Sequence, residues 1–180
     1  MRKPRKKNYI NNSDLHRVLS EYIEKIKDPL VISKPAIPKY IGEAIMMIAR
    51  KYVNHVHFVA YSQHYKEEMI SDGVMNCVKY LNTYNPEAAT RSGYPNPFGW
   101  FTQIIKNAFK QRLKDEKRHQ YFKARSSLDY HLLNNDKDFI SEDNDVYENN
   151  LRFIKDYENS VVEKKKLCKK KQGLEEFIED

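Results

Sequence analysis

The sequence predicts an all-α protein: a compact helical bundle with a flexible basic N-terminal arm and a long, partly disordered C-terminal extension. Apolar residues recur at steps of three and four over several segments, as one face of an α-helix requires. Only five glycines occur among 180 residues, too few for a turn-rich β fold or a glycine-rich phosphate loop. The one strand-like stretch, 55–65, is isolated, so we expect it to be a connector.

The N-terminal part is predicted to be an arm followed by a helix. Residues 1–10 carry five cations and form the expected basic arm. The first helix begins at Asn12 or Ser13, either of which can cap it. It ends at Asp28, because the residue before a proline avoids helical backbone angles and Pro29 follows.

The next two helices are predicted over 38–54 and 65–83. The third helix contains Gly73, which costs about 1 kcal/mol relative to alanine and therefore suggests a close helix approach. We expect its inner face to bury Ile70, Val74, Cys77, Val78 and Leu81, and its outer face to present Glu68, Asp72, Met75, Asn76 and Lys79. An exposed methionine between carboxylates suits a partner helix bearing arginines. Periodicity alone favours the simpler interpretation of a solvated acidic face.

The fourth predicted helix, 96–121, is the electrostatic centre of the chain. It opens with Pro97 at a first helical position and has Trp100, the chain's single tryptophan, near its start. One face is apolar, with Phe101, Ile104, Ile105, Ala108, Phe109 and Leu113. The opposite face carries Gln103, Asn107, Lys110, Lys114, Lys117 and Tyr121. Amides, cations and aromatic rings suit nucleic acid, as does the formal net charge of +7. The alternative is an ordinary amphipathic helix with a solvated basic face.

Beyond residue 126 the helical pattern weakens. We expect an acidic, asparagine-rich linker, one further helix over 146–162, a lysine-rich run and an apolar-acidic end. The domain boundaries predicted from these changes are 1–10, 11–126, 127–172 and 173–180.

The two cysteines, Cys77 and Cys168, lie far apart without a CxxC pair, which favours reduced thiols in a cytoplasm. The histidines at 55, 57 and 64 lack the ligand spacing of a metal site, and we expect no cofactor.

The third and fourth helices together resemble region 2 of bacterial sigma factors. The stretch 68–77, EMISDGVMNC, matches the family's D-L-I-Q-E-G-N-I-G-L pattern with the glycine in register. In that family the helix docks on the β′ clamp coiled coil of RNA polymerase. The resemblance implies that Glu68, Ser71, Asp72, Met75 and Asn76 bind polymerase.

The stretch 98–109, FGWFTQIIKNAF, resembles the family's aromatic segment that captures the promoter −10 element. By this match Trp100 takes the place of the tyrosine that stacks on a flipped adenine, and Asn107 and Lys110 approach the upstream −10 base pair. Gln103 and Ile104 stand where the family has two tryptophans. The implied DNA-binding residues are Phe98, Trp100, Phe101, Gln103, Lys106, Asn107, Lys110, Lys114 and Lys117.

No helix-turn-helix pattern follows residue 126, so nothing resembles the family's reader of the −35 element. A sigma factor limited to region 2 is similar to the late-transcription sigma factor family of T-even-type bacteriophages. The matching stretches are NYINN, IGEAIMMIA, YSQHYKEEMISDG and the GLEEFIED end. The resemblance implies that Leu174, Phe177 and Ile178 bind the phage's DNA sliding clamp. It implies as partners the host's core RNA polymerase, including its β flap, promoter DNA, the clamp and a phage co-activator. It further implies a place in the cytoplasm of the infected bacterial host. No apolar run approaches the length of a membrane span, so we expect no membrane partner.

Two other classes remain open from the residues. A basic helical DNA-binding protein acting without RNA polymerase would explain the fourth helix, but neither the acidic helix nor the apolar-acidic end. A small nuclease would need a carboxylate cluster, a nucleophile–base pair or zinc-ligand spacing, and the sequence supplies none of these. We therefore expect a protein that is not an enzyme.

Overall fold

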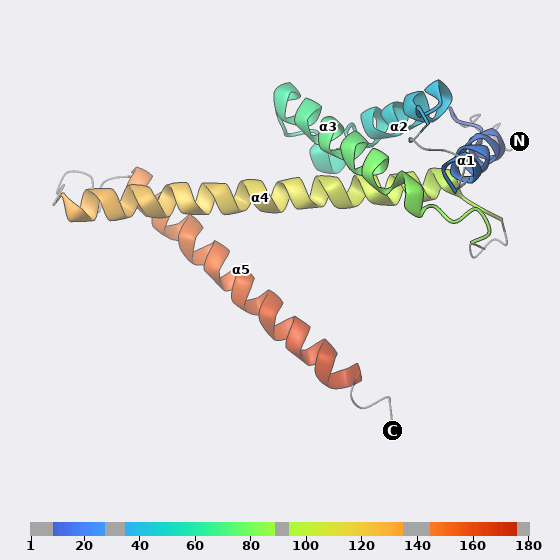
Figure 1. Cartoon of the computed structure of the whole chain (residues 1–180). Coiled ribbons are helices and arrows are strands. Elements are labelled where there is room, and N and C mark those ends of the chain that lie inside the picture. The colour runs from blue at the N-terminus through green and yellow to red at the C-terminus, as the bar shows by residue number, and fades with distance from the viewer. Residues whose placement is uncertain (1–8, 28–34, 89–93, 135–144, 176–180) are drawn as a thin grey trace, which may run out of the picture. The chain divides into compact units, whose positions relative to one another are not determined.

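The computed structural model describes residues 9–27, 35–88, 94–134 and 145–175, and within these ranges the chain is helical, without a strand. The helices are α1 (Asn12–Lys27), α2 (Lys39–Tyr52), α3 (Gln63–Tyr80), α4 (Pro97–Leu133) and α5 (Asp145–Glu175) (Figure 1). Two short 3-10 turns, η1 (Val56–Phe58) and η2 (Leu81–Thr83), join them. The prediction of an all-α protein is confirmed, as is that of a connector after the second helix.

The chain divides into two compact units, Met1–Leu113 and Lys114–Asp180. The first unit contains α1, α2, α3 and the beginning of α4, and the second contains the rest of α4 and α5. The boundary predicted at residue 126 therefore differs from the division of the structure, which falls inside α4.

Side-chain caps hold the starts of three helices. At the start of α1, Asn11 Oδ1 accepts a hydrogen bond from the Ser13 amide at 3.1 Å, so the cap is Asn11, whereas Asn12 or Ser13 was expected. The Ser62 hydroxyl oxygen accepts a hydrogen bond from the Tyr65 amide at 3.3 Å at the start of α3. At the start of α4, the side-chain Oδ1 of Asn96 accepts a hydrogen bond from the Gly99 amide at 2.9 Å. Asn12 of α1 accepts from the Phe98 amide at 3.1 Å, so the beginning of the basic helix is tied to the beginning of α1.

Phe109 is fully buried in the core of the first unit. Its ring lies 5.7 Å from that of Tyr52 and 5.5 Å from that of Phe58. A Cβ atom placed on Gly73 would lie only 3.0 Å from Phe109 Cε1. The glycine of α3 therefore allows the close approach of α4 that its position within a helix suggested.

Helices α3 and α4 run antiparallel in the first unit. Near the start of α3, Glu68 meets Arg112, whereas near its end the Cys77 sulfur lies 4.0 Å from the Phe101 carbonyl oxygen. The inner face of α3 consists of Met69, Gly73 and Cys77. The predicted burial of Val78 is wrong, since its exposed fraction is 45%. Turning Gly73 toward α4 places Val78 outside the contact.

The chain departs from the sequence prediction at both ends. Ile10, assigned to the basic arm, is buried in the core, while residues 1–8 lie outside the described part. The region 127–172, expected to be largely linker, contains the end of α4 and most of α5, which continues to Glu175. These segments pack through Ala124, Leu128 and Ile154, a second small core that the sequence analysis missed.

Burial raises the pKa of the Cys77 thiol from 9.0 to about 12. The folded state therefore holds this proton more tightly than the unfolded state, and its contribution to stability is complete below pH 9. We expect the free energy of unfolding to fall as the pH rises from about 9 to 12, and urea denaturation at several pH values measures this.

In a Cys168→Ser background, alkylation at pH 8 should reach Cys77 only in the denatured protein. Rapid alkylation without denaturant would contradict this burial.

Candidate protein-binding and nucleic-acid-binding surfaces

The acidic residues expected to receive a partner's arginine are bound by an arginine of the same chain. Arg112 of α4 donates a hydrogen bond from Nη1 to Asp72 Oδ2 at 2.8 Å, and from Nη2 to Glu68 Oε2. Its guanidinium carbon also lies 5.7 Å from the ring centroid of Tyr65. The hydrogen bond to Asp72 is the main cause of a raised pKa for Arg112. These contacts link α3 to α4.

This internal ion pair leaves only part of the acidic face available. The side chains of Glu68 and Asp72 retain 38% and 35% of their exposure. The sequence analysis gave Arg112 no role of its own, and the pairing with Glu68 and Asp72 was therefore missed. A signal was present: Arg112 stands three residues after Phe109 and directly before Leu113, at the edge of the buried face.

The other residues predicted to bind polymerase lie on the outer side of α3. Met75 is 69% exposed, an unusual position for a long apolar side chain. Ser71 is exposed, and its hydroxyl donates to the Glu67 carbonyl oxygen at 3.0 Å. Asn76 is partly buried and donates to the Asp72 carbonyl oxygen at 2.8 Å. Met75 is therefore the residue of this set best placed to contact a partner.

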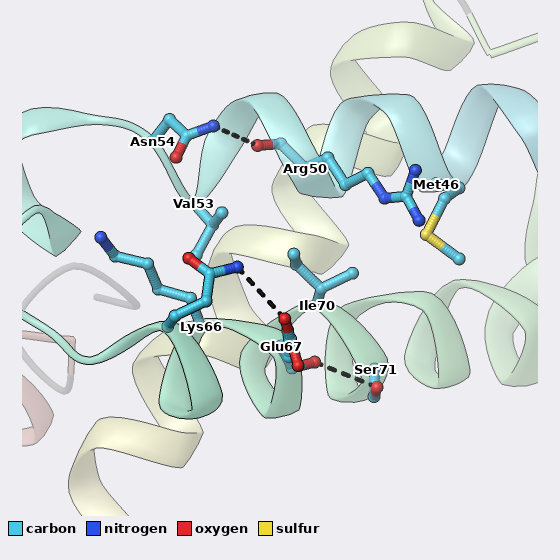
Figure 2. A pocket seen from close by; sticks show the side chains of 9 residues that line it. Met46, Arg50, Val53, Asn54, Lys66, Glu67, Ile70 and Ser71 are labelled. Atoms are coloured by element: carbon cyan, nitrogen blue, oxygen red, sulfur yellow. Dashed lines mark hydrogen bonds between the residues drawn. The ribbon is translucent and has the colours of Figure 1, made fainter.

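A pocket of about 490 Å³ lies between α2 and α3, next to Ser71 (Figure 2). Met46, Val53 and Ile70 supply apolar walls, and Arg50 extends along α2 toward Met46. The remaining lining residues are Asn54, Gln63, Lys66, Glu67 and Ser71. Most of these polar groups already bond within the chain: Gln63 to Glu67 at 3.2 Å, Lys66 to the Val59 carbonyl at 3.1 Å and Asn54 to the Arg50 carbonyl at 3.0 Å. The pocket therefore has few unsatisfied groups with which to hold a small polar ligand.

The aromatic residues predicted to contact DNA have different surroundings. Phe101 is fully buried in the core and cannot reach DNA in this structure, so its assignment as a contact is corrected. Trp100 is half-buried, with ring centroids of Tyr84 and Phe101 at 5.1 and 4.9 Å. Phe98 is half-buried and packs edge-on against Tyr9 at 5.7 Å. Trp100 and Phe98 therefore combine packing in the domain with partial exposure.

The polar DNA-binding candidates of the first unit lie along one side of α4. Gln103 Nε2 donates a hydrogen bond to Asn107 Oδ1 at 3.0 Å, and both side chains are exposed. Lys110 is exposed and Lys106 is half-buried. Lys114 and Lys117 are exposed on the same helix but belong to the second unit.

The predicted clamp-binding residues fall at the edge of the described chain. Leu174 belongs to α5, whereas Phe177 and Ile178 lie outside the described residues. Among the residues that the structure describes, no three His, Cys, Asp or Glu side chains converge as a metal site would require. Nor does any helix in the described ranges have the length and apolar content needed to cross a bilayer. No protein-family model matches the chain, and no curated protein matches it significantly.

Proposed function

We propose that this chain is a sigma factor limited to region 2, serving late transcription of a T-even-type bacteriophage. Through α3 it binds core RNA polymerase of the host, and through α4 it recognises and helps open a −10-like promoter element without a −35 reader. The observation that carries the proposal is the position of Gly73. A Cβ added to the glycine that matches the family's pattern would lie 3.0 Å from Phe109 Cε1 and 3.4 Å from Ile105 Cγ2, so the two matched segments are packing partners.

Promoter opening would depend on the polymerase. Stacking one extruded base on an aromatic ring contributes about 1–3 kcal/mol, enough to retain a transient bubble but too little to melt a duplex alone. Lys106 and Lys110 would contact phosphates in a salt-dependent manner. The free chain should consequently bind promoter duplex poorly.

The C-terminal end would contact the phage sliding clamp through Leu174, Phe177 and Ile178. So short a segment buries few side chains, and its affinity by itself should be about micromolar. Binding of both proteins to the same DNA would raise the effective concentration of this contact.

Met75 provides the direct test of the polymerase contact. Because Met75 is 69% exposed, Met75→Glu should leave the fold intact while placing a charge in the contact, and should weaken binding of core polymerase at least tenfold. Met47→Glu is the matched control, since Met47 is a 41% exposed methionine on α2. Binding is measured by titrating labelled chain with core enzyme, followed by run-off transcription from a template with only an AT-rich −10-like element.

Equal affinity of the wild type and both variants would contradict the assignment of α3 as the polymerase contact. A wild-type chain that binds DNA but neither binds core polymerase nor supports run-off transcription would favour the second candidate. That candidate is a helical DNA-binding protein acting alone, and the basic side of α4 is the observation that supports it.

A further inference from the structure

A second pocket, of about 360 Å³, lies between the end of α3 and α4 in the first unit. Its lining residues are Asn76 and Tyr80 from α3 and Ile104, Asn107, Ala108 and Gln111 from α4. Three carboxamides and one phenol thus surround a small apolar floor.

The internal hydrogen bonds determine which polar atoms remain in this pocket. Asn76 uses Nδ2 to donate to the Asp72 carbonyl, which leaves its Oδ1 as an acceptor. Asn107 uses Oδ1 to accept from Gln103, which leaves its Nδ2 as a donor. The pocket therefore offers one acceptor from α3 and one donor from α4, the pair of functions needed to bind a group that carries both.

Tyr80 supplies an aromatic surface at the same place. It is 44% exposed, and the Lys79 ammonium lies 5.7 Å from its ring centroid. Ala108 is 8% exposed and contributes to the apolar floor together with the half-buried Ile104. A flat, partly apolar ligand with polar edges fits this combination better than an aliphatic side chain, which would leave the amides without partners.

The surrounding charge indicates an anionic ligand. Lys79 on α3 and Lys106 and Lys110 on α4 stand beside lining residues in the chain, and none of them forms an ion pair with another described residue. A planar heterocycle joined to phosphates matches these features. Its ring can stack on the Tyr80 phenol, its polar edge can hydrogen-bond to the amides of Asn76 and Asn107, and its phosphates can contact the lysines.

We propose that this α3–α4 pocket binds one unpaired nucleobase of single-stranded DNA, with Tyr80 as the stacking surface and Asn76 and Asn107 as hydrogen-bonding groups. Duplex DNA cannot use the pocket, because its bases are stacked and their pairing edges are occupied. This assignment rests on the proposed function in one respect only, namely that the single strand comes from a melted promoter. It places base binding at Tyr80, in addition to Trp100, whose ring is packed between Tyr84 and Phe101.

The test uses the full-length chain without polymerase, so that its result does not depend on the proposed function. A single-stranded hexanucleotide with 2-aminopurine at one position is titrated with the chain, and stacking is followed as fluorescence quenching. We expect quenching with the single strand and none with the matching duplex. Tyr80→Ala should weaken binding about 5- to 100-fold, whereas Tyr80→Phe should stay within about threefold of wild type.

Two further variants keep the result interpretable. Asn107→Ala alters an exposed helix position and should weaken binding several-fold without affecting the circular dichroism spectrum. Tyr130→Ala, at a tyrosine 64% exposed in the second unit, should leave binding unchanged. Wild-type binding by both Tyr80→Ala and Asn107→Ala, or the absence of quenching by the wild-type chain, would overturn the proposal.

The free nucleotide distinguishes the two possible sources of the base. 2-Aminopurine nucleoside monophosphate should bind at least tenfold more weakly than the hexanucleotide, because it offers the lysines a single phosphate. Equal affinity for the two would overturn the assignment to a DNA strand. Loss of polymerase binding in the experiments on Met75 would leave this result unaffected, so the two proposals can fail separately.

Discussion

Replacing Phe109 with alanine should lower the free energy of unfolding by about 3–5 kcal/mol, the range for removing a buried aromatic side chain. Phe109 is fully buried and packs against Tyr52 and Phe58 as well as against Gly73. The glycine offers no side chain to fill the resulting cavity, and the neighbouring rings belong to other elements. Urea denaturation followed by circular dichroism measures the loss.

Phe122→Ala is the matched control for this prediction. Phe122 is the same residue type on the same helix but is 51% exposed, so its removal should change the free energy of unfolding by less than about 1 kcal/mol. Comparable losses of unfolding free energy in the two variants would contradict the role of Phe109 in the core of the first unit.

Exchanging the charges of Asp72 and Arg112 should separate their internal role from a role in polymerase binding. Asp72→Arg alone would place two guanidinium groups together and damage the link between α3 and α4, so loss of function in that variant has two explanations. The double variant Asp72→Arg/Arg112→Glu restores an attractive pair, and the new arginine also lies four residues from Glu68 on the same helix. We expect near-wild-type stability but at least tenfold weaker binding to core polymerase.

Arg112→Ala tests the stabilising role of the ion pair by itself. It should lower the free energy of unfolding by about 1–2 kcal/mol, because two carboxylates lose their cation while all three side chains keep roughly a third of their exposure. If the double variant is stable and binds polymerase like the wild type, Asp72 acts only within the chain. The proposed contact would then depend on Met75 and Ser71.

Part of the candidate surfaces could be inferred from the sequence alone. The exposed position of Met75 and the exposure of Gln103, Asn107 and Lys110 follow from helical periodicity, and the structure places all four as predicted. The pocket between α3 and α4 could not be inferred, because Tyr80 and Asn107 are 27 positions apart in the sequence. Residues on two antiparallel helices become neighbours only through the register of their packing.

The sequence by itself determined the helical class, the connector after the second helix, the start of α4 at Pro97 and the core face formed by Phe101, Ile105 and Phe109. These features depend on interactions over three or four residues, which an apolar pattern records directly. Only the tertiary structure decided the rotation of α3 about Gly73 and the choice of Arg112 as partner of Glu68 and Asp72. Periodicity indicates which residues share a helix face, whereas contacts forty residues apart are set by the packing of one helix against another.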